Sequence, residues 1–204
     1  MGILDGAMTV RRFRVVGDVP EDFRDVYRDR LEEYSFHERP NDVGKEEVEG
    51  WVQVHNLLDN SFADFNRWLY NQYAVFSLRV DKKSLPANLF RATLDKKCQE
   101  WCVEANLERC PTGVRKQIKE ELEFDWLKRA FPRVSTTECC WNITGGSLIL
   151  HSLSTGSGER FQKRFYRTFG LKLVPWSPLD WVEDTDRVDQ LLSVGPSALH
   201  GELT

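Results

Sequence analysis

The chain lacks the features that mark several common classes of protein. No stretch of its 204 residues approaches the roughly 18 consecutive apolar residues of a membrane span. The N-terminus does not show the basic and then apolar order of a secretory signal. No glycine-rich phosphate-binding loop occurs either, which argues against nucleotide hydrolysis. These absences predict a cytoplasmic protein that does not associate with a membrane.

Cysteine and histidine are too few and too scattered to form a recognisable metal site or catalytic group. The five cysteines are Cys98, Cys102, Cys110, Cys139 and Cys140. An odd number in a chain without a secretion signal predicts reduced thiols rather than a disulfide framework. No Cys-x-x-Cys pair or nearby histidine completes a zinc set, and the four histidines do not suggest a nucleophile and base by their spacing. We therefore expect no metal and no other cofactor.

Acidic residues near the C-terminus offer one alternative route to metal chemistry. They are Glu183, Asp184, Asp186 and Asp189. Such carboxylates can bind magnesium, as nucleases require. A solvated acidic terminus explains them more simply, so a metal-dependent exonuclease is the alternative to the non-enzymatic function that we predict.

The chain does contain enough apolar sequence for a folded core, together with an uneven distribution of charge. Apolar residues make up 41% and aromatic residues 12% of the chain, which favours one domain or two small lobes over disorder. The net charge is -4, yet residues 111–172 hold 11 basic against 6 acidic residues. Residues 173–204 hold 1 against 6. Because a local basic zone can dominate the field at a binding surface, the middle of the chain is a candidate for an anionic partner.

Hydrophobic periodicity predicts an α+β fold, an antiparallel sheet with long helices packed on it. Strands are expected over residues 9–16, 51–55, 73–80, 139–143, 147–152 and 171–174. Helices are expected from residues 20 and 84, and over residues 114–130 and 155–169, with a loop over residues 40–50. The order strand-helix-strand-strand is used twice, which points to two similar units. We divide the chain into a flexible leader (residues 1–8), an α+β domain (9–178) and an acidic tail (179–204).

The predicted helix over residues 155–169 carries the clearest candidate binding surface. At about 100° per residue, four basic side chains share one arc, while Phe161, Phe165 and Phe169 occupy another. The four are Arg160, Lys163, Arg164 and Arg167. Since only Glu159 lies nearby in the sequence, they are not neutralised locally, the pattern expected of a helix that contacts phosphates. A solvated helix face is the competing interpretation.

A second group of cations lies where the helix over residues 114–130 meets the following strands. These cations are Lys128, Arg129 and Arg133. Pro132 ends the helix or begins the loop, and Phe131 is apolar enough to be expected beneath the strands. Cations also suit a helix C-terminus for structural reasons. Lys82 and Lys83, at the end of a predicted strand, are further candidates, with an ordinary surface position as the alternative.

The order of these motifs over residues 9–178 resembles the RdgC family, recombination-associated DNA-binding proteins of bacteria. Residues 76–86 look like the family's strand and leucine-proline helix start. Residues 118–133 look like its helix ending in L-x-R-A-F-x-R, and residues 141–150 like its tryptophan-bearing hairpin. The helix over residues 159–169 and the Val174-Pro175 ending are in register with the same pattern.

The resemblance implies binding of duplex and single-stranded DNA without sequence preference, by homodimers that encircle or clamp duplex through a positively lined channel. It also implies restraint of RecA-driven recombination and a place in the nucleoid. The helix 155–169 cations and the junction cations would then contact phosphates, which carry no base identity. The chain has Lys128 where the family has proline and Asn142 where it has aspartate, and it stops near the end of the family's first half. A protein-interaction module without DNA binding is the remaining alternative.

Overall fold

The fold is a curled antiparallel sheet, seen here in a computed structural model that describes residues 2–3, 8–37, 45–177, 180, 182 and 185–193. Its strands are β1 (Arg11–Val16), β2 (Glu47–Val52), β3 (Leu69–Tyr70), β4 (Tyr73–Lys82), β5 (Arg133–Asn142), β6 (Ser147–Leu150) and β7 (Lys172–Pro175). They are ordered β2-β4-β5-β6-β1-β7, and β3 also pairs with β4. All of these pairings are antiparallel, so the predicted α+β fold is confirmed.

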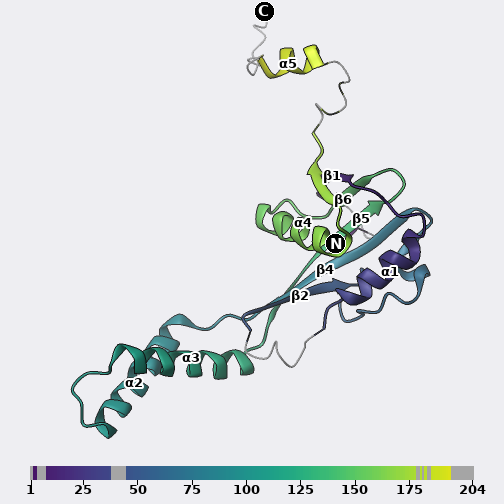
Figure 1. Ribbon diagram of the computed structural model, residues 1–204. Helices are drawn as coiled ribbons and strands as arrows, with labels where there is room; N and C mark the ends of the chain where they lie inside the picture. Colours follow the sequence, from purple (N-terminus) through teal and green to yellow (C-terminus); the bar gives the residue numbers. More distant parts are fainter. Residues whose placement is uncertain are drawn as a thin grey trace, which may run out of the picture.

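The helices divide into those that cover the sheet and those that leave it. They are α1 (Phe23–Glu33), the short η2 (Phe65–Arg67), α2 (Ala87–Glu104), α3 (Thr112–Arg129), α4 (Thr155–Phe169) and α5 (Thr185–Ser193). α1 and α4 lie against one face of the sheet, whereas α2 and α3 form a helical hairpin that projects from it (Figure 1). The expectation that the long helices pack on the sheet is therefore right for α1 and α4 and wrong for α2 and α3.

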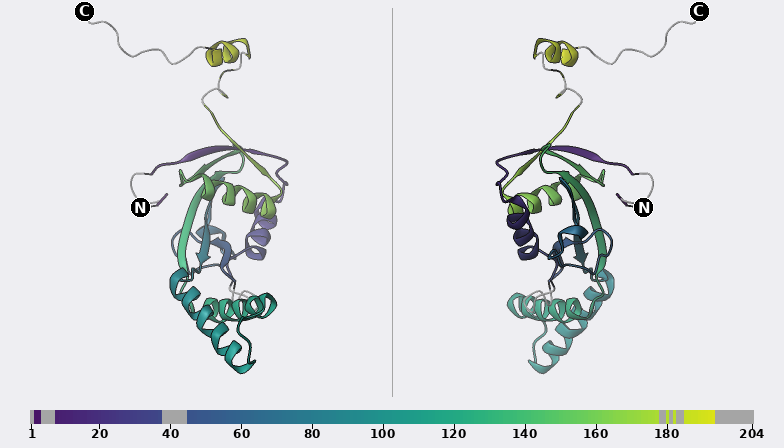
Figure 2. Two further views of the ribbon diagram at one scale, coloured as in Figure 1. Left: turned by 90° about the vertical axis from the view of Figure 1, so that its left-hand side faces the viewer. Right: turned by 90° about the vertical axis from the view of Figure 1, so that its right-hand side faces the viewer.

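The helical hairpin projects because it is inserted between two paired strands. β4 and β5 form a continuous ladder from Tyr73 opposite Asn142 to Lys82 opposite Arg133, and the chain enters α2 and leaves α3 at that last pair. Figure 2 shows the hairpin at the end of the molecule opposite β1. It has its own small cluster of buried residues, Leu94, Cys98 and Leu122, which holds α2 against α3 without help from the sheet.

The main core is aromatic and lies between α4, α1 and the sheet. Phe161 and Phe165 of α4 are fully buried, as the predicted apolar arc of this helix requires. They meet Trp51 and Trp141 from the strands, with ring centroids 5.4 Å apart for Trp51 and Phe161 and 5.1 Å apart for Trp141 and Phe165. The indole N–H of Trp51 donates to the Thr168 hydroxyl at 2.8 Å, so its polar atom is satisfied inside the core. This packing fixes which side of α4 faces outward.

Several predicted boundaries shift in the structure. β2 begins at Glu47, within the segment predicted as a loop, because its whole length pairs with β4, starting from Glu47 opposite Lys82. β5 begins at Arg133 rather than at residue 139, since its whole length pairs with β4. The repeated strand-helix-strand-strand order gives no equivalent units, because α1 covers the sheet and the helical hairpin does not. Most of the predicted leader and much of the acidic tail lie outside the described residues.

Replacing Tyr27 with phenylalanine is expected to raise the free energy of unfolding by about 1 kcal/mol at neutral pH. Tyr27 is buried in α1, and its hydroxyl has no hydrogen-bond partner among the described residues. Burial also raises the pKa of Tyr27 from 10.0 to about 12. The unfolded chain therefore ionises first, so the free energy of unfolding of the wild type is unaffected by this group below pH 10 and falls as the pH rises from 10 to about 12, a loss that the phenylalanine variant lacks. Urea denaturation across this range checks both effects, and an equal alkaline loss in the variant would contradict them.

Candidate nucleic-acid interface

α4 is held in place at both ends, which fixes the direction of its basic side chains. The Ser154 hydroxyl caps the first turn by accepting a hydrogen bond from the Ser157 N–H at 3.4 Å. Gly170 ends the helix with φ 72°, a left-handed conformation that favours glycine. With Phe161 and Phe165 turned into the core, the basic arc of α4 faces the edge strand β2 and solvent.

Two of the four α4 cations are engaged in ion pairs with β2. Arg160 is hydrogen-bonded to the Glu47 carboxylate, and Arg164 lies 3.6 Å from that of Glu49. Arg164 also donates to the carbonyl oxygens of Tyr34 and Glu49, at 3.1 and 3.2 Å. The expectation that all four α4 cations lack ionic partners is therefore wrong for these two arginines, because their partners are distant in the sequence.

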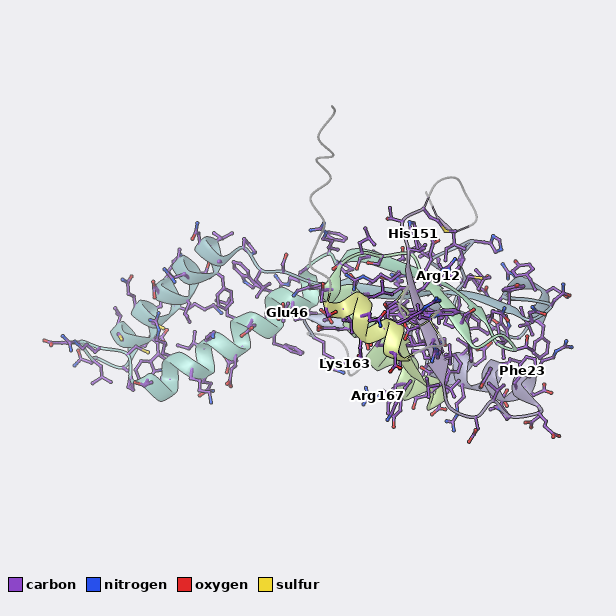
Figure 3. The ribbon with its side chains drawn as sticks, turned by 90° about the horizontal axis from the view of Figure 1, so that it is seen from above. Arg12, Phe23, Glu46, His151, Lys163 and Arg167 are labelled. Atoms are coloured by element: carbon purple, nitrogen blue, oxygen red, sulfur yellow. The ribbon has the colours of Figure 1, made fainter. Side chains whose placement is uncertain are left out.

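The other two cations of α4, Lys163 and Arg167, are exposed. Within the described part of the chain, neither forms an ion pair or a hydrogen bond through its side chain. Seen from above, they lie on the same side of the body (Figure 3). The structure thus separates the four α4 cations into two arginines that hold β2 and two cations that remain available to a ligand.

The junction after α3 brings cations from separate segments together. A pocket of about 240 Å³ is lined by Lys45, Lys83, Lys128 and Arg129, with Asp81 as its acidic residue. Lys83 is buried there, whereas Lys128 and Arg129 are exposed. Of the remaining predicted residues, Lys82 lies 3.5 Å from Glu46, and Arg133 pairs with Lys82 in the sheet without lining the pocket.

Phe131 contradicts the prediction that it lies beneath the strands, since it is 96% exposed. The chain leaves α3 in an extended conformation at Ala130, with ψ 136°, and Pro132 follows. Leu127, one turn earlier, is buried at the base of α3, and the extended residues after it run out toward solvent. Phe131 also lines the junction pocket, so it places an exposed ring beside Lys128 and Arg129.

The junction pocket and the α4 cations belong to one continuous hollow surface. Lys45 and Val48 line both the junction pocket and a neighbouring pocket of about 530 Å³ that contains Arg164 and Arg167. Glu47 and Glu49 line that pocket and a third one, which contains Arg160 and Lys163. We call this surface the basic groove, defined by Lys45, Lys83, Lys128, Arg129, Lys163 and Arg167. Sequence reasoning missed Lys45, which stands alone in a polar segment and gave no signal.

The structure offers no evident site for a metal ion among the residues that it describes. No group of three or more histidine, cysteine, aspartate or glutamate side chains there is arranged to hold one. Of the acidic residues considered above, Asp186 and Asp189 lie on α5, while Glu183 and Asp184 lie outside the described residues. No described helix is both long enough and apolar enough to cross a bilayer.

Comparison with known proteins decides the family. A family sequence model with the description "Putative exonuclease, RdgC" matches residues 10–186, which is most of the chain. The chain belongs to the RdgC family. The match includes the Leu127 to Arg133 junction, the β5-β6 hairpin and α4, the segments that carried the resemblance.

Individual RdgC proteins give the same result over a shorter segment. The chain is 32% identical over 102 residues to the "Recombination-associated protein RdgC" of Neisseria meningitidis, a match that covers 48% of this chain. The protein of the same name from Neisseria gonorrhoeae gives the same identity and coverage. The matched segment spans 33% of the length of each relative. The matched half of this RdgC-family chain therefore corresponds to about a third of these relatives.

Proposed function

We propose that this RdgC-family chain binds DNA through the phosphate backbone, without sequence preference, as part of a function in recombination. One observation carries the proposal: the basic groove gathers cations from four separate segments of the chain around one hollow surface. Separate segments contribute Lys45, Lys83, the pair at the end of α3, and the pair on α4. An arrangement that depends on tertiary structure is harder to attribute to solubility than a run of charge along one helix.

The acidic residues of the groove are largely occupied by other partners. Glu47 and Glu49 pair with Arg160 and Arg164. The Asp81 carboxylate receives two hydrogen bonds from the Arg79 guanidinium, at 2.7 and 2.6 Å. Lys128, Arg129, Lys163 and Arg167 are exposed and remain as the cations that a phosphate chain would meet. Lysine and arginine contacts to phosphate release counterions and position a protein without reading its sequence.

The cellular part of the proposal follows from the family. The Neisseria relatives are named recombination-associated proteins, and we extend that association to this chain. On this proposal the protein acts in the cytoplasm at the nucleoid, modulates RecA-dependent recombination or replication, and works as a homodimer. Binding without cleavage is proposed as its activity, and RecA as a protein partner.

The test is a salt titration of binding to short duplex and single-stranded DNA, with and without magnesium. Two double variants, Lys128→Ala/Arg129→Ala and Lys163→Ala/Arg167→Ala, each remove two exposed cations from the groove. Each is expected to reduce the magnitude of the negative slope of log K against log salt by about 2, since each phosphate contact contributes about 0.9 on duplex. The control, Lys96→Ala/Lys97→Ala, removes the same charge from exposed positions on α2 and should leave the slope nearly unchanged.

Each outcome of this titration bears on a different part of the proposal. Equal loss in the control would mean that net charge, not the groove, governs binding. Absence of binding at low salt would reject the DNA function and favour a protein-interaction module. Magnesium-dependent shortening of the DNA by the wild type would show cleavage and overturn the non-enzymatic proposal.

A further inference from the structure

Three of the five cysteines gather at the far end of the helical hairpin, away from the basic groove. Cys98 and Cys102 lie on α2, and Cys110 comes just before α3. All three line an open cavity of about 920 Å³ at the connection between the two helices. None of these thiols belongs to the basic groove or takes part in the proposed DNA binding.

Cys98 and Cys110 are the two cysteines that the fold brings to one cluster of packed side chains. Cys98 is buried in the hairpin cluster with Leu94 and Leu122, and Cys110 packs against the same cluster from the connection. Both thiols also line the same cavity. Cys102 lines that cavity as well but is not part of the cluster, although it lies one helical turn from Cys98. The chain therefore offers one preferred pair.

A charged side chain lies beside the buried thiol of Cys98. Nη1 of Arg115, on α3, lies 3.8 Å from Sγ of Cys98. The same guanidinium is fixed by Asp95 of α2, with Nη2 2.7 Å from the carboxylate oxygen. Burial, followed by the neighbouring Cys110 thiol, raises the pKa of Cys98, and the Arg115 charge opposes this rise only in part. Cys110 is half-buried and is the more accessible of the two.

We propose that Cys98 and Cys110 form a reversible disulfide that ties α2 to the connection before α3, by exchange with a small disulfide such as oxidised glutathione. The Cys110 thiolate attacks one glutathione sulfur, forming a mixed disulfide and releasing one glutathione thiol. The Cys98 thiolate then attacks the Cys110 sulfur and releases the second glutathione. Two protein thiols are oxidised, one disulfide is reduced to two thiols, and the two protein protons pass to the departing thiolates.

The position of this bond gives it a structural effect. The hairpin has a small cluster of its own, in which Leu94, Cys98 and Leu122 are buried and Phe90, Cys110, Ile118 and Trp126 pack against them. A covalent link across the cluster restricts the unfolded hairpin and lowers the rate of its local opening. The disulfide is therefore a redox control on the helical hairpin that leaves the sheet unchanged.

The test incubates the full chain in glutathione buffers of increasing oxidised fraction, alkylates the remaining thiols and maps the linked peptides by mass. The expected product joins Cys98 to Cys110, blocks two thiols from alkylation and reverses with excess reduced glutathione. Hydrogen exchange at the end of α2 should slow at least tenfold in the oxidised form. Cys102→Ser is the matched control and should form the same bond.

Several results would overturn the inference. A disulfide from Cys102 to either of the other two cysteines would mean that the proposed pair is wrong. A stable glutathione adduct on one cysteine would mean that the second exchange does not occur. Cys110→Ser, at a half-buried position, should abolish both the bond and the slowed exchange while retaining the reduced fold. If that variant still showed slowed exchange on oxidation, the effect would arise elsewhere in the chain.

Discussion

Replacing Trp51 with alanine is expected to lower the free energy of unfolding by about 3–5 kcal/mol, the usual cost of deleting a large buried aromatic side chain. Trp51 is fully buried on β2, and its ring packs edge-on to Phe76 and Phe161, with centroids 5.0 and 5.4 Å away. The change also removes the hydrogen bond to the Thr168 hydroxyl and opens a cavity between the sheet and α4. Urea denaturation of the variant and the wild type measures the difference.

Val103→Ala is the control for this prediction, because it also truncates an apolar side chain but at a position that is 81% exposed. It should change the free energy of unfolding by no more than about 0.5 kcal/mol, as surface substitutions usually do. A Trp51 variant as stable as this control would mean that β2 and α4 do not form the core described above.

Replacing Arg164 with alanine is expected to lower the free energy of unfolding by about 2–3 kcal/mol, because hydrogen bonds to a charged group are lost together with an ion pair. The Arg164 side chain is only 12% exposed. Its guanidinium joins the Tyr34 and Glu49 carbonyl oxygens, and its charge lies over the Tyr34 ring, 5.3 Å from the centroid. Without it, the edge strand β2 loses the ion pair and the carbonyl hydrogen bond that join Glu49 to α4. Denaturation midpoints in urea give the measurement.

Arg167→Ala, one turn further along α4, should weaken DNA binding without a large change in stability. Its side chain is exposed, so the free energy of unfolding should stay within about 0.5 kcal/mol of the wild type. DNA affinity should fall, and the negative slope of log K against log salt should become smaller in magnitude by about 1. Measuring stability and binding on both variants separates the two kinds of arginine. Equal losses of stability in the Arg164 and Arg167 variants would contradict the division of the four α4 cations into structural and ligand-facing ones.

Local periodicity was sufficient to predict most of the fold. The α4 bounds match the predicted helix, because Ser154 and Gly170 cap it and its phenylalanines recur at helical spacing. The β5-β6 hairpin was predicted from its glycine turn, although the start of β5 was not, since residues 133–138 are mostly exposed and lack a clear alternation. Long-range pairing with β4 extends that strand, and no local pattern reports such pairing.

The candidate site was less predictable, because its electrostatics depend on which distant segments meet. Periodicity placed Arg160 and Arg164 on one arc of α4, but their neutralisation by Glu47 and Glu49 depends on where the edge strand β2 lies. That strand comes more than 100 residues earlier: the sequence separation is 113 for the Arg160 pair and 115 for the contact between Arg164 and the Glu49 carbonyl oxygen. Lys45 was missed for the same reason. Phe131 was predicted to be buried from its apolar character alone, whereas the extended backbone after α3 exposes it.

The insertion of the helical hairpin between β4 and β5 means that the reach of this arm can vary independently of the body. The ladder from Tyr73 to Lys82 and from Arg133 to Asn142 is complete in itself, so its register does not depend on how long α2 and α3 are. Adding or removing matched turns from both helices, each worth about 5.4 Å, would move the cysteine-bearing tip while the sheet kept its pairing. The architecture therefore lets the length of the arm change while the base that carries the basic groove stays fixed.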